Sequence, residues 1–272
     1  MINLMRIEEL LKKDRYQVFL LTCPATLPFS FAAHPWFVVN DTKTVLRYGI
    51  SWQHTLIRKE YAEGCLYKYG GDLEAGVPVT PIFQDVFPQI WHGRLMGYIE
   101  GSEDSPAARM AEVIENSLRT YPYVHAYSVF GPNSNTYAQW VLDHFPEPPL
   151  QLPWNAFGKE WGYSGIVTKG SKLARSLGYP TLNIPFTDLH VSGIYAGKTR
   201  LKGKEYESAL FVNHKRRLLE AHLLGFTGDA YGEKVRMRLV EKIRDDRYFE
   251  EEIALKEAIK KDVEKVRNYF TR

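Results

Sequence analysis

Four prolines lie within residues 146–153, in the stretch PEPPLQLPW, and interrupt any regular element that would cross it. Proline lacks the backbone N–H that helices and central strands use, so a helix or strand must end there. Helical patterns precede this stretch, and short strand-like segments separated by glycine, lysine and aspartate follow it. We therefore predict two domains, residues 1–160 and 161–272, with the junction near residues 159–162. A chain of 272 residues is long enough for each domain to have its own core.

Residues 1–160 mix helical and strand patterns. The clearest helix is predicted to start after Ser105, a good N-cap, with Pro106 at its first position and apolar residues recurring on one face. The other predicted elements are a short surface helix at 4–13, an aromatic-rich strand at 31–40 and a short helix at 137–145. This mixture predicts an α+β domain.

Residues 161–272 read as short strands followed by one helix. In residues 233–243, Val235, Met237 and Leu239 alternate with arginines, as in a strand with one buried face. Similar segments occupy 163–168, 192–201, 206–213 and 218–224. Five or six short strands at such spacing predict a small, closed or partly closed antiparallel barrel. The barrel would be closed by a helix at 250–270, whose apolar stripe is Leu255, Ile259, Val263, Val266 and Phe270.

Composition excludes several classes of protein. The net charge of +3, with acidic and basic residues interleaved, does not indicate a nucleic-acid partner. Two cysteines, Cys23 and Cys65, form neither a disulfide framework nor a paired metal motif. The apolar run at 16–39 contains Pro24 and Pro28 and follows acidic residues, unlike a secretory signal, and no run is long enough to span a membrane. We expect a cytoplasmic protein with no membrane partner; the oligomeric state is not indicated.

A glycine-containing, basic segment at 165–181 is the first candidate site. Backbone N–H groups exposed by glycine, together with nearby cations, suit a polyphosphate, and the residues involved are Gly170, Lys172, Arg175 and Gly178. The spacing matches neither the Walker pattern nor the dinucleotide fingerprint. A basic hairpin loop on a barrel is an equally good interpretation.

Three further polar residues follow this loop. Thr181 and Asn183 are two apart, so in an extended chain their oxygens lie on one face and could hold Mg²⁺. Alternatively, they bond the backbone of a turn. Glu220 interrupts an apolar strand whose Leu219 and Ala221 flank it. It is either a general base facing a ligand or a surface glutamate paired with an arginine.

Taken together, GIVTKGSKLARSLGYPTLNI, SGIYAGKT, LLEAHLLGFTGDAYG and the C-terminal helix closely resemble the riboflavin kinase (flavokinase) family, in the right order over about residues 165–270. The resemblance implies a six-stranded Greek-key barrel. It also implies a phosphotransferase that converts riboflavin and ATP to FMN and ADP with Mg²⁺. Thr181 and Asn183 would hold the metal and phosphates, Glu220 would be the catalytic base, and the loop from Gly170 to Arg175 would cover the nucleotide. Arg244 and Phe249 would lie near the flavin.

The sequence departs from this family at three points. Ala174 stands where the family has glycine, and Leu182 where it has alanine. The family's longer connection after Asn213 is mostly missing. The alternative function is therefore a non-catalytic flavin- or nucleotide-binding module on the same barrel.

Residues 16–161 resemble an uncharacterised bacterial domain family marked by an H-x-W strand and a GPNSNT helix start, here His34 and residues 131–136. Circularly permuted papain-like amidases place a histidine on such a strand and a cysteine nucleophile at such a helix start. Here Ser134 occupies that start, which leaves an amidase or peptidase activity using His34 and Ser134 as a third hypothesis. An ordinary N-cap cluster is the favoured interpretation.

Overall fold

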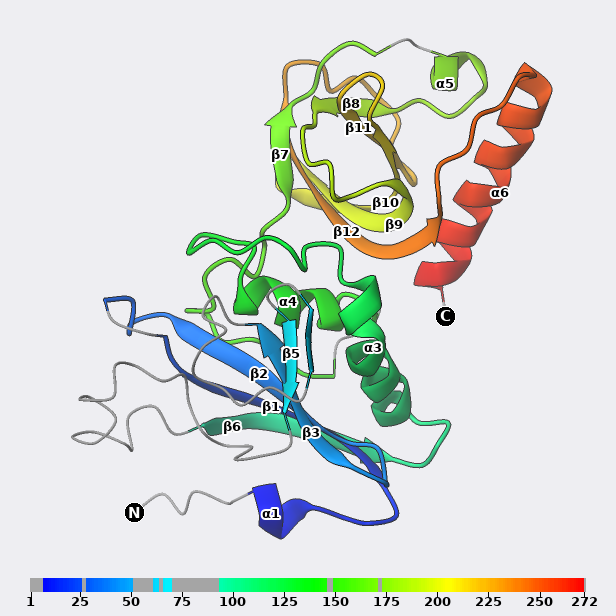
Figure 1. The fold of residues 1–272 in the computed structure, drawn as a ribbon. Helices are drawn as coiled ribbons and strands as arrows, with labels where there is room; N and C mark the ends of the chain where they lie inside the picture. The colour runs from blue at the N-terminus through cyan, green and yellow to red at the C-terminus, as the bar shows by residue number, and fades with distance from the viewer. Residues whose placement is uncertain are drawn as a thin grey trace. The chain divides into compact units, whose positions relative to one another are not determined.

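A computed structural model describes residues 7–25, 28–50, 61–63, 66–69, 93–145, 149–170 and 173–271 (Figure 1). The chain divides into two units, Met1–Glu160 and Trp161–Arg272. Within the described residues, each unit has its own six-stranded sheet. Cys65 and Lys172 lie outside the described residues.

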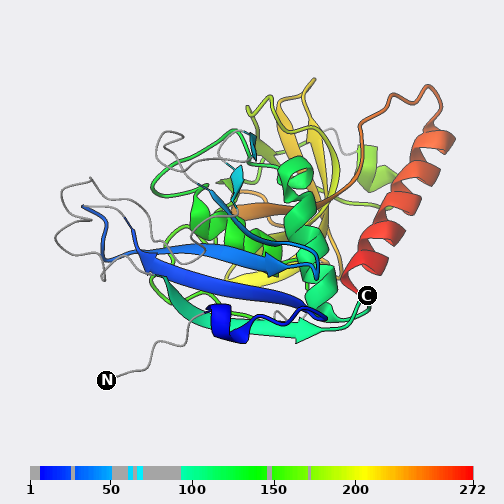
Figure 2. The same ribbon diagram turned by 60° about the horizontal axis from the view of Figure 1, so that its bottom comes forward.

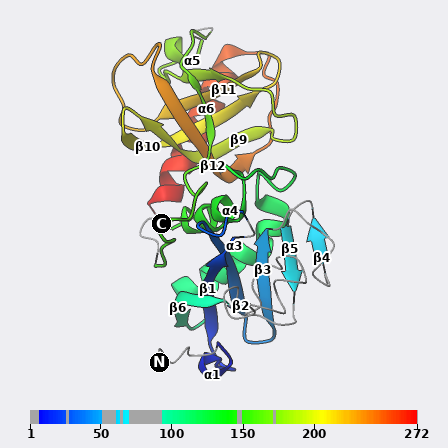
Figure 3. The same cartoon turned by 90° about the vertical axis from the view of Figure 1, so that its left-hand side faces the viewer.

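The first unit is built on one antiparallel sheet, whose strands lie in the order β4-β5-β3-β2-β1-β6 (Figure 3). Their bounds are β1 Tyr16–Pro24, β2 Ala33–Asn40, β3 Val45–Ile50, β4 Tyr61–Glu63, β5 Leu66–Tyr69 and β6 Arg94–Gly101. The described residues of β1 and β2 are almost wholly buried, because both faces of these central strands are covered.

Helices cover both faces of this sheet (Figures 1 and 2). On one face, α3 (Pro106–Thr120) lies against β1 and β6, and α4 (Ser134–Leu142) lies against β2 and β3. On the other face, Ile7 of α1 (Ile7–Leu10) belongs to a core cluster with Trp36. The predicted N-cap is confirmed, since the Ser105 side chain accepts a hydrogen bond from the N–H of Ala108.

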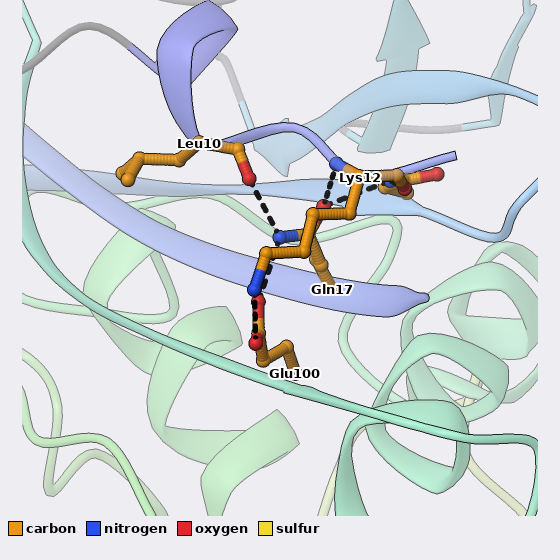
Figure 4. A network of polar contacts seen from close by, with 5 residues as sticks. Leu10, Lys12, Gln17 and Glu100 are labelled. Carbon is orange, nitrogen blue, oxygen red and sulfur yellow. Dashed lines mark hydrogen bonds and ion pairs between the residues drawn. The ribbon is translucent and has the colours of Figure 1, made fainter. Parts of the chain in front are cut away.

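The first helix ends earlier than predicted, because buried amides bind the chain that follows it (Figure 4). The Lys12 backbone N–H donates to Gln17 Oε1 at 2.9 Å, and the Lys12 carbonyl accepts from Asn40 Nδ2 at 2.8 Å. Gln17 Nε2 donates both to the Leu10 carbonyl and to Glu100. These bonds satisfy groups that a longer helix would have used, so the helix ends at Leu10.

The second unit is an antiparallel near-barrel with strands in the order β7-β12-β9-β10-β11-β8 (Figures 1 and 3). Their bounds are β7 Tyr163–Ile166, β8 Leu182–Pro185, β9 Gly193–Leu201, β10 Lys204–Asn213, β11 Leu218–Leu223 and β12 Lys234–Arg244. A bridge between Thr168 and Asn183 joins the two ends of the sheet, because the Thr168 N–H donates to the Asn183 carbonyl at 2.8 Å. The predicted barrel is thereby confirmed.

Alternation along the strands sorts side chains into a core face and an outer face. Val235, Met237 and Leu239 are buried, as are Leu219 and Ala221 on β11. Helix α6 (Glu252–Phe270) packs on the outside, where Val266 and Phe270 meet Ala196 of β9 and Ala209 of β10 (Figure 1). The helix and its apolar stripe are as predicted.

Among the described residues, no helix is both long enough and apolar enough to cross a lipid bilayer.

Candidate active site

The polar face of β11 carries Glu220, which lies between two other strands. Its cross-strand partners are Asn183 on β8 and Phe211 on β10. At the end of β10, Asn213 Nδ2 donates to Glu220 Oε1 at 2.9 Å. The sequence left an arginine partner open, but in the structure this carboxylate is bound by the Asn213 amide. The strand register therefore brings the proposed base beside one of the proposed phosphate ligands.

Thr181 and Asn183 lie close together, as their spacing predicts. The Thr181 hydroxyl is 3.4 Å from Asn183 Oδ1, at the long limit of a hydrogen bond. Gly170 lies directly against the Asn183 amide. A Cβ added at this glycine would lie only 3.0 Å from Asn183 Cγ. Only a residue without a side chain leaves that amide in place. Two oxygens on one face, beside a glycine loop, form a donor set suited to Mg²⁺ held mainly by phosphates.

His222 ties the turn before β8 to β11, a role that the sequence did not reveal. Its Nδ1 lies 3.0 Å from the Pro180 carbonyl, and its ring meets the ring of Tyr179 edge-on at 5.5 Å. A carbonyl can only accept, so Nδ1 carries the proton. Burial is the main cause that lowers the pKa of His222, which favours the neutral imidazole. Strand alternation alone puts His222 on the same face as Glu220, but its contact with Pro180 depends on the fold.

The rest of the predicted phosphate loop is only partly described. Arg175 is exposed in the short helix α5 (Leu173–Ser176), and Gly178 follows with φ of +94°. That conformation favours glycine, and here it ends the short helix, with the Tyr179 N–H donating back to the Ala174 carbonyl at 2.8 Å. The contacts of Gly170 with Asn183, and of Tyr179 with His222, bring both described ends of the loop to the polar face of the barrel.

Arg244 and Phe249 lie together, with the Arg244 guanidinium carbon 5.9 Å from the Phe249 ring centre. Arg244 is also bound by Asp262 of α6, with Nε donating to Oδ1 at 2.9 Å and Nη2 to Oδ2 at 2.6 Å. This bidentate ion pair fixes the end of β12 to α6. Lys215, in the turn after β10, lies 5.2 Å from the Tyr248 ring. The segment that carries Phe249 therefore lies next to the turn that follows Asn213.

In the first unit, the GPNSNT sequence forms a helix cap. The Asn133 side chain accepts from the N–H groups of Asn135 and Thr136, and Thr136 Oγ1 accepts from the Asn133 N–H. Asn133 Nδ2 also donates to the carbonyl of Phe157. This reciprocal cap starts α4 at Ser134, earlier than predicted. The polar residues of this cluster therefore have a structural role as a helix cap.

The structure does not bring His34 and Ser134 together. On β2, Phe37 faces α4 and meets Tyr137. His34 has the opposite parity and shares its face with Trp36, which packs against Ile7. The third hypothesis needed His34 on the face of α4, so the alternation of β2 removes its geometric basis. The cross-strand neighbour of His34 is instead Cys23, a buried thiol whose Sγ donates to the Pro24 carbonyl.

Burial, and to a lesser degree the positive charge of Arg47, lowers the pKa of His34 from 6.5 to about 3. The unfolded chain therefore binds a proton at His34 that the folded chain does not bind, and stability is lost as the pH falls from 6.5 toward 3. We expect acidification from pH 7 to pH 5 to cost about 2 kcal/mol through this group. Thermal or urea unfolding at both pH values, compared between wild type and His34→Gln, measures this loss of stability.

His125→Gln, at an exposed histidine, is the control and should keep the full pH dependence. Equal pH dependence in wild type and His34→Gln would contradict a buried, neutral His34.

Comparison with protein families accounts for both units. Residues 17–161 match the family described as Protein of unknown function (DUF3750), and residues 157–270 match Flavokinase, described as riboflavin kinase. The first match covers more than half of the chain. The chain belongs to the DUF3750 family, and its second unit is a riboflavin kinase family domain.

Curated relatives support the riboflavin kinase domain. A bifunctional riboflavin kinase/FMN adenylyltransferase of Buchnera aphidicola is 36% identical over 135 residues, covering 46% of this chain and 43% of the relative. The Haemophilus influenzae protein of the same name is 37% identical over 133 residues, covering 44% and 42%. The chain thus spans less than half the length of these relatives. The crystal structure of riboflavin kinase from Trypanosoma brucei aligns with 26% identity and a TM-score of 0.30, over 40% of this chain and 78% of that one.

Within the riboflavin kinase domain, the connection after Asn213 is a tight hairpin. Asn213 pairs with Leu218, so only residues 214–217 join β10 to β11. The structure shows directly the short connection that the sequence indicated.

Proposed function

We propose that residues 161–272 transfer the γ-phosphate of ATP to the 5′-hydroxyl of riboflavin, giving FMN and ADP. The observation that carries this proposal is the pairing of Glu220 with Asn183 across β11 and β8. It puts a carboxylate that can take a proton next to an amide oxygen suited to a magnesium–phosphate complex. The family of the domain and the names of its relatives point to the same chemistry.

Glu220 would accept the proton of the 5′-hydroxyl as that oxygen bonds to the γ-phosphorus. The bond from the γ-phosphorus to the bridging oxygen breaks, and ADP leaves with that oxygen. Mg²⁺ would neutralise charge on the phosphates, with Thr181 and Asn183 as its protein oxygens. Most of the catalysis then comes from positioning and charge, for which a rigid strand pair is well suited.

The remaining predicted residues support binding. Gly170, Lys172, Arg175 and Gly178 would enclose the nucleotide phosphates with N–H groups and cations. Phe249 offers a flat apolar face for the flavin ring, and Arg244, held by Asp262, would keep this segment in place. Dependence on ATP favours the cytoplasm as the location. The proposal does not extend to the DUF3750 unit.

A non-catalytic flavin-binding module is the second candidate, and the short connection of residues 214–217 favours it. Formation of ADP separates the two. With the full chain, ATP and Mg²⁺, the kinase should release ADP only when riboflavin is added, one ADP for each FMN. A binding module should quench riboflavin fluorescence and release no ADP. ADP release that ignores riboflavin would contradict the proposed function.

A further inference from the structure

Asn213, the last residue of β10, uses both ends of its side-chain amide. Nδ2 donates to Glu220 Oε1 at 2.9 Å, and Oδ1 accepts from the backbone N–H of Arg216 at 3.2 Å. One side chain therefore closes the turn of residues 214–217 and holds one oxygen of the proposed base. Because the two atoms of the amide are rigidly linked, the position of the turn and the rotation of the carboxylate are fixed together.

We propose that Asn213 is a positioning residue for Glu220 in phosphoryl transfer, an inference that rests on the proposed function. A glutamate at half-buried depth on a strand has several rotamers, and only some direct an oxygen at the substrate. The charge-assisted bond from Asn213 holds Oε1, which leaves Oε2 for the 5′-hydroxyl. Asn213 keeps the base in its productive rotamer without touching the substrate.

The two hydrogen bonds of Asn213 also link Glu220 to the segment that carries Phe249, the residue proposed to bind the flavin. The turn that Asn213 closes carries Lys215, which lies against the ring of Tyr248, next to Phe249. A long connection after β10 is thus not needed to position the segment of Tyr248 and Phe249 relative to Glu220. In this chain, four turn residues and one amide do so.

The decisive variant is Asn213→Asp. It has the same shape and keeps an oxygen to accept the Arg216 N–H, but it replaces the N–H donor with a carboxylate oxygen facing Glu220. We expect kcat for FMN formation to fall about tenfold or more, since a misdirected base loses much of its advantage. KM for riboflavin should change less than about twofold, because the groups proposed to bind riboflavin are untouched.

Asn268→Asp, the same change at an exposed position of α6, should leave both constants unchanged. An unchanged kcat in Asn213→Asp would overturn the inference. If the aspartate variant does not fold, an unchanged kcat in Asn213→Ala would overturn it equally; KM is not used for that variant, because alanine also removes the acceptor of the Arg216 N–H.

A double-mutant cycle in thermal unfolding tests the contact without turnover. Two facing carboxylates should lower the midpoint of Asn213→Asp by roughly 2 °C or more. In the Glu220→Gln background this penalty should disappear, because the new aspartate can accept from the glutamine amide. Additive midpoints would overturn the contact even if the protein makes FMN. Coupled midpoints in a wild type that makes no FMN would instead refute the proposed function while leaving the contact intact.

Discussion

FMN formation should fall by about 10²–10⁴-fold when Glu220 is replaced by glutamine, the range that general-base catalysis supplies. Glutamine keeps the shape of the side chain and can still bond Asn213, but it cannot accept the proton of the 5′-hydroxyl. Riboflavin affinity should stay within about threefold of wild type, since the residues expected to hold the flavin are unchanged. Single-turnover FMN formation and a fluorescence titration with riboflavin measure the two quantities on one preparation.

Glu207→Gln is the matched control, because Glu207 is an exposed glutamate on the adjacent strand β10. It should leave the rate of FMN formation unchanged. If Glu220→Gln retained the wild-type rate, Glu220 would not be the base, whatever the activity of the domain.

The second large effect is expected for Asn183→Ala. Asn183 is only 3% exposed, and its amide lies against Gly170 and close to the Thr181 hydroxyl. Its removal would take one oxygen from the proposed magnesium–phosphate complex. We expect KM for MgATP to rise about tenfold or more, because an oriented hydrogen bond or ligand to a charged group is worth about 1.5–3 kcal/mol. Initial rates over a range of ATP, with Mg²⁺ varied independently, measure the effect.

The cause of that loss can be separated from general damage. Excess Mg²⁺ should partly restore the rate of Asn183→Ala, because mass action fills a weakened site. Asn268→Ala, at an exposed asparagine, should behave as wild type. A loss of rate with no change in the dependence on MgATP would contradict a role for Asn183 in nucleotide binding.

Local pattern was sufficient where one residue or one periodicity decides the structure. Ser105 caps the start of α3 because a hydroxyl in this position can accept a backbone N–H of the first turn. The alternation around Met237 and the stripe around Val266 specify which faces of β12 and α6 are buried. The same logic put Thr181 and Asn183 on one face of an extended segment, and the two oxygens lie 3.4 Å apart.

The remaining features depend on pairings between distant residues. Periodicity put Glu220 on a polar face, but its position beside Asn183 depends on the register between β11 and β8, which no local pattern encodes. In the sequence, Asn213 is only the residue before a shortened connection. Its bond to Glu220 forms only when β10 and β11 pair as a hairpin. His34 and Ser134 matched a motif in sequence, yet the alternation of β2 directs His34 to the other face. Motif spacing does not record which face of a sheet a helix covers.

The most direct test of the central claim is FMN production by the intact chain. The purified protein is incubated with riboflavin, ATP and Mg²⁺, and the flavins are separated by chromatography with fluorescence detection. We predict FMN in proportion to the amount of protein, none without Mg²⁺, and a loss of product with Glu220→Gln that Glu207→Gln does not share. Riboflavin bound to the protein but never converted to FMN would contradict the account and leave the domain as a flavin-binding module.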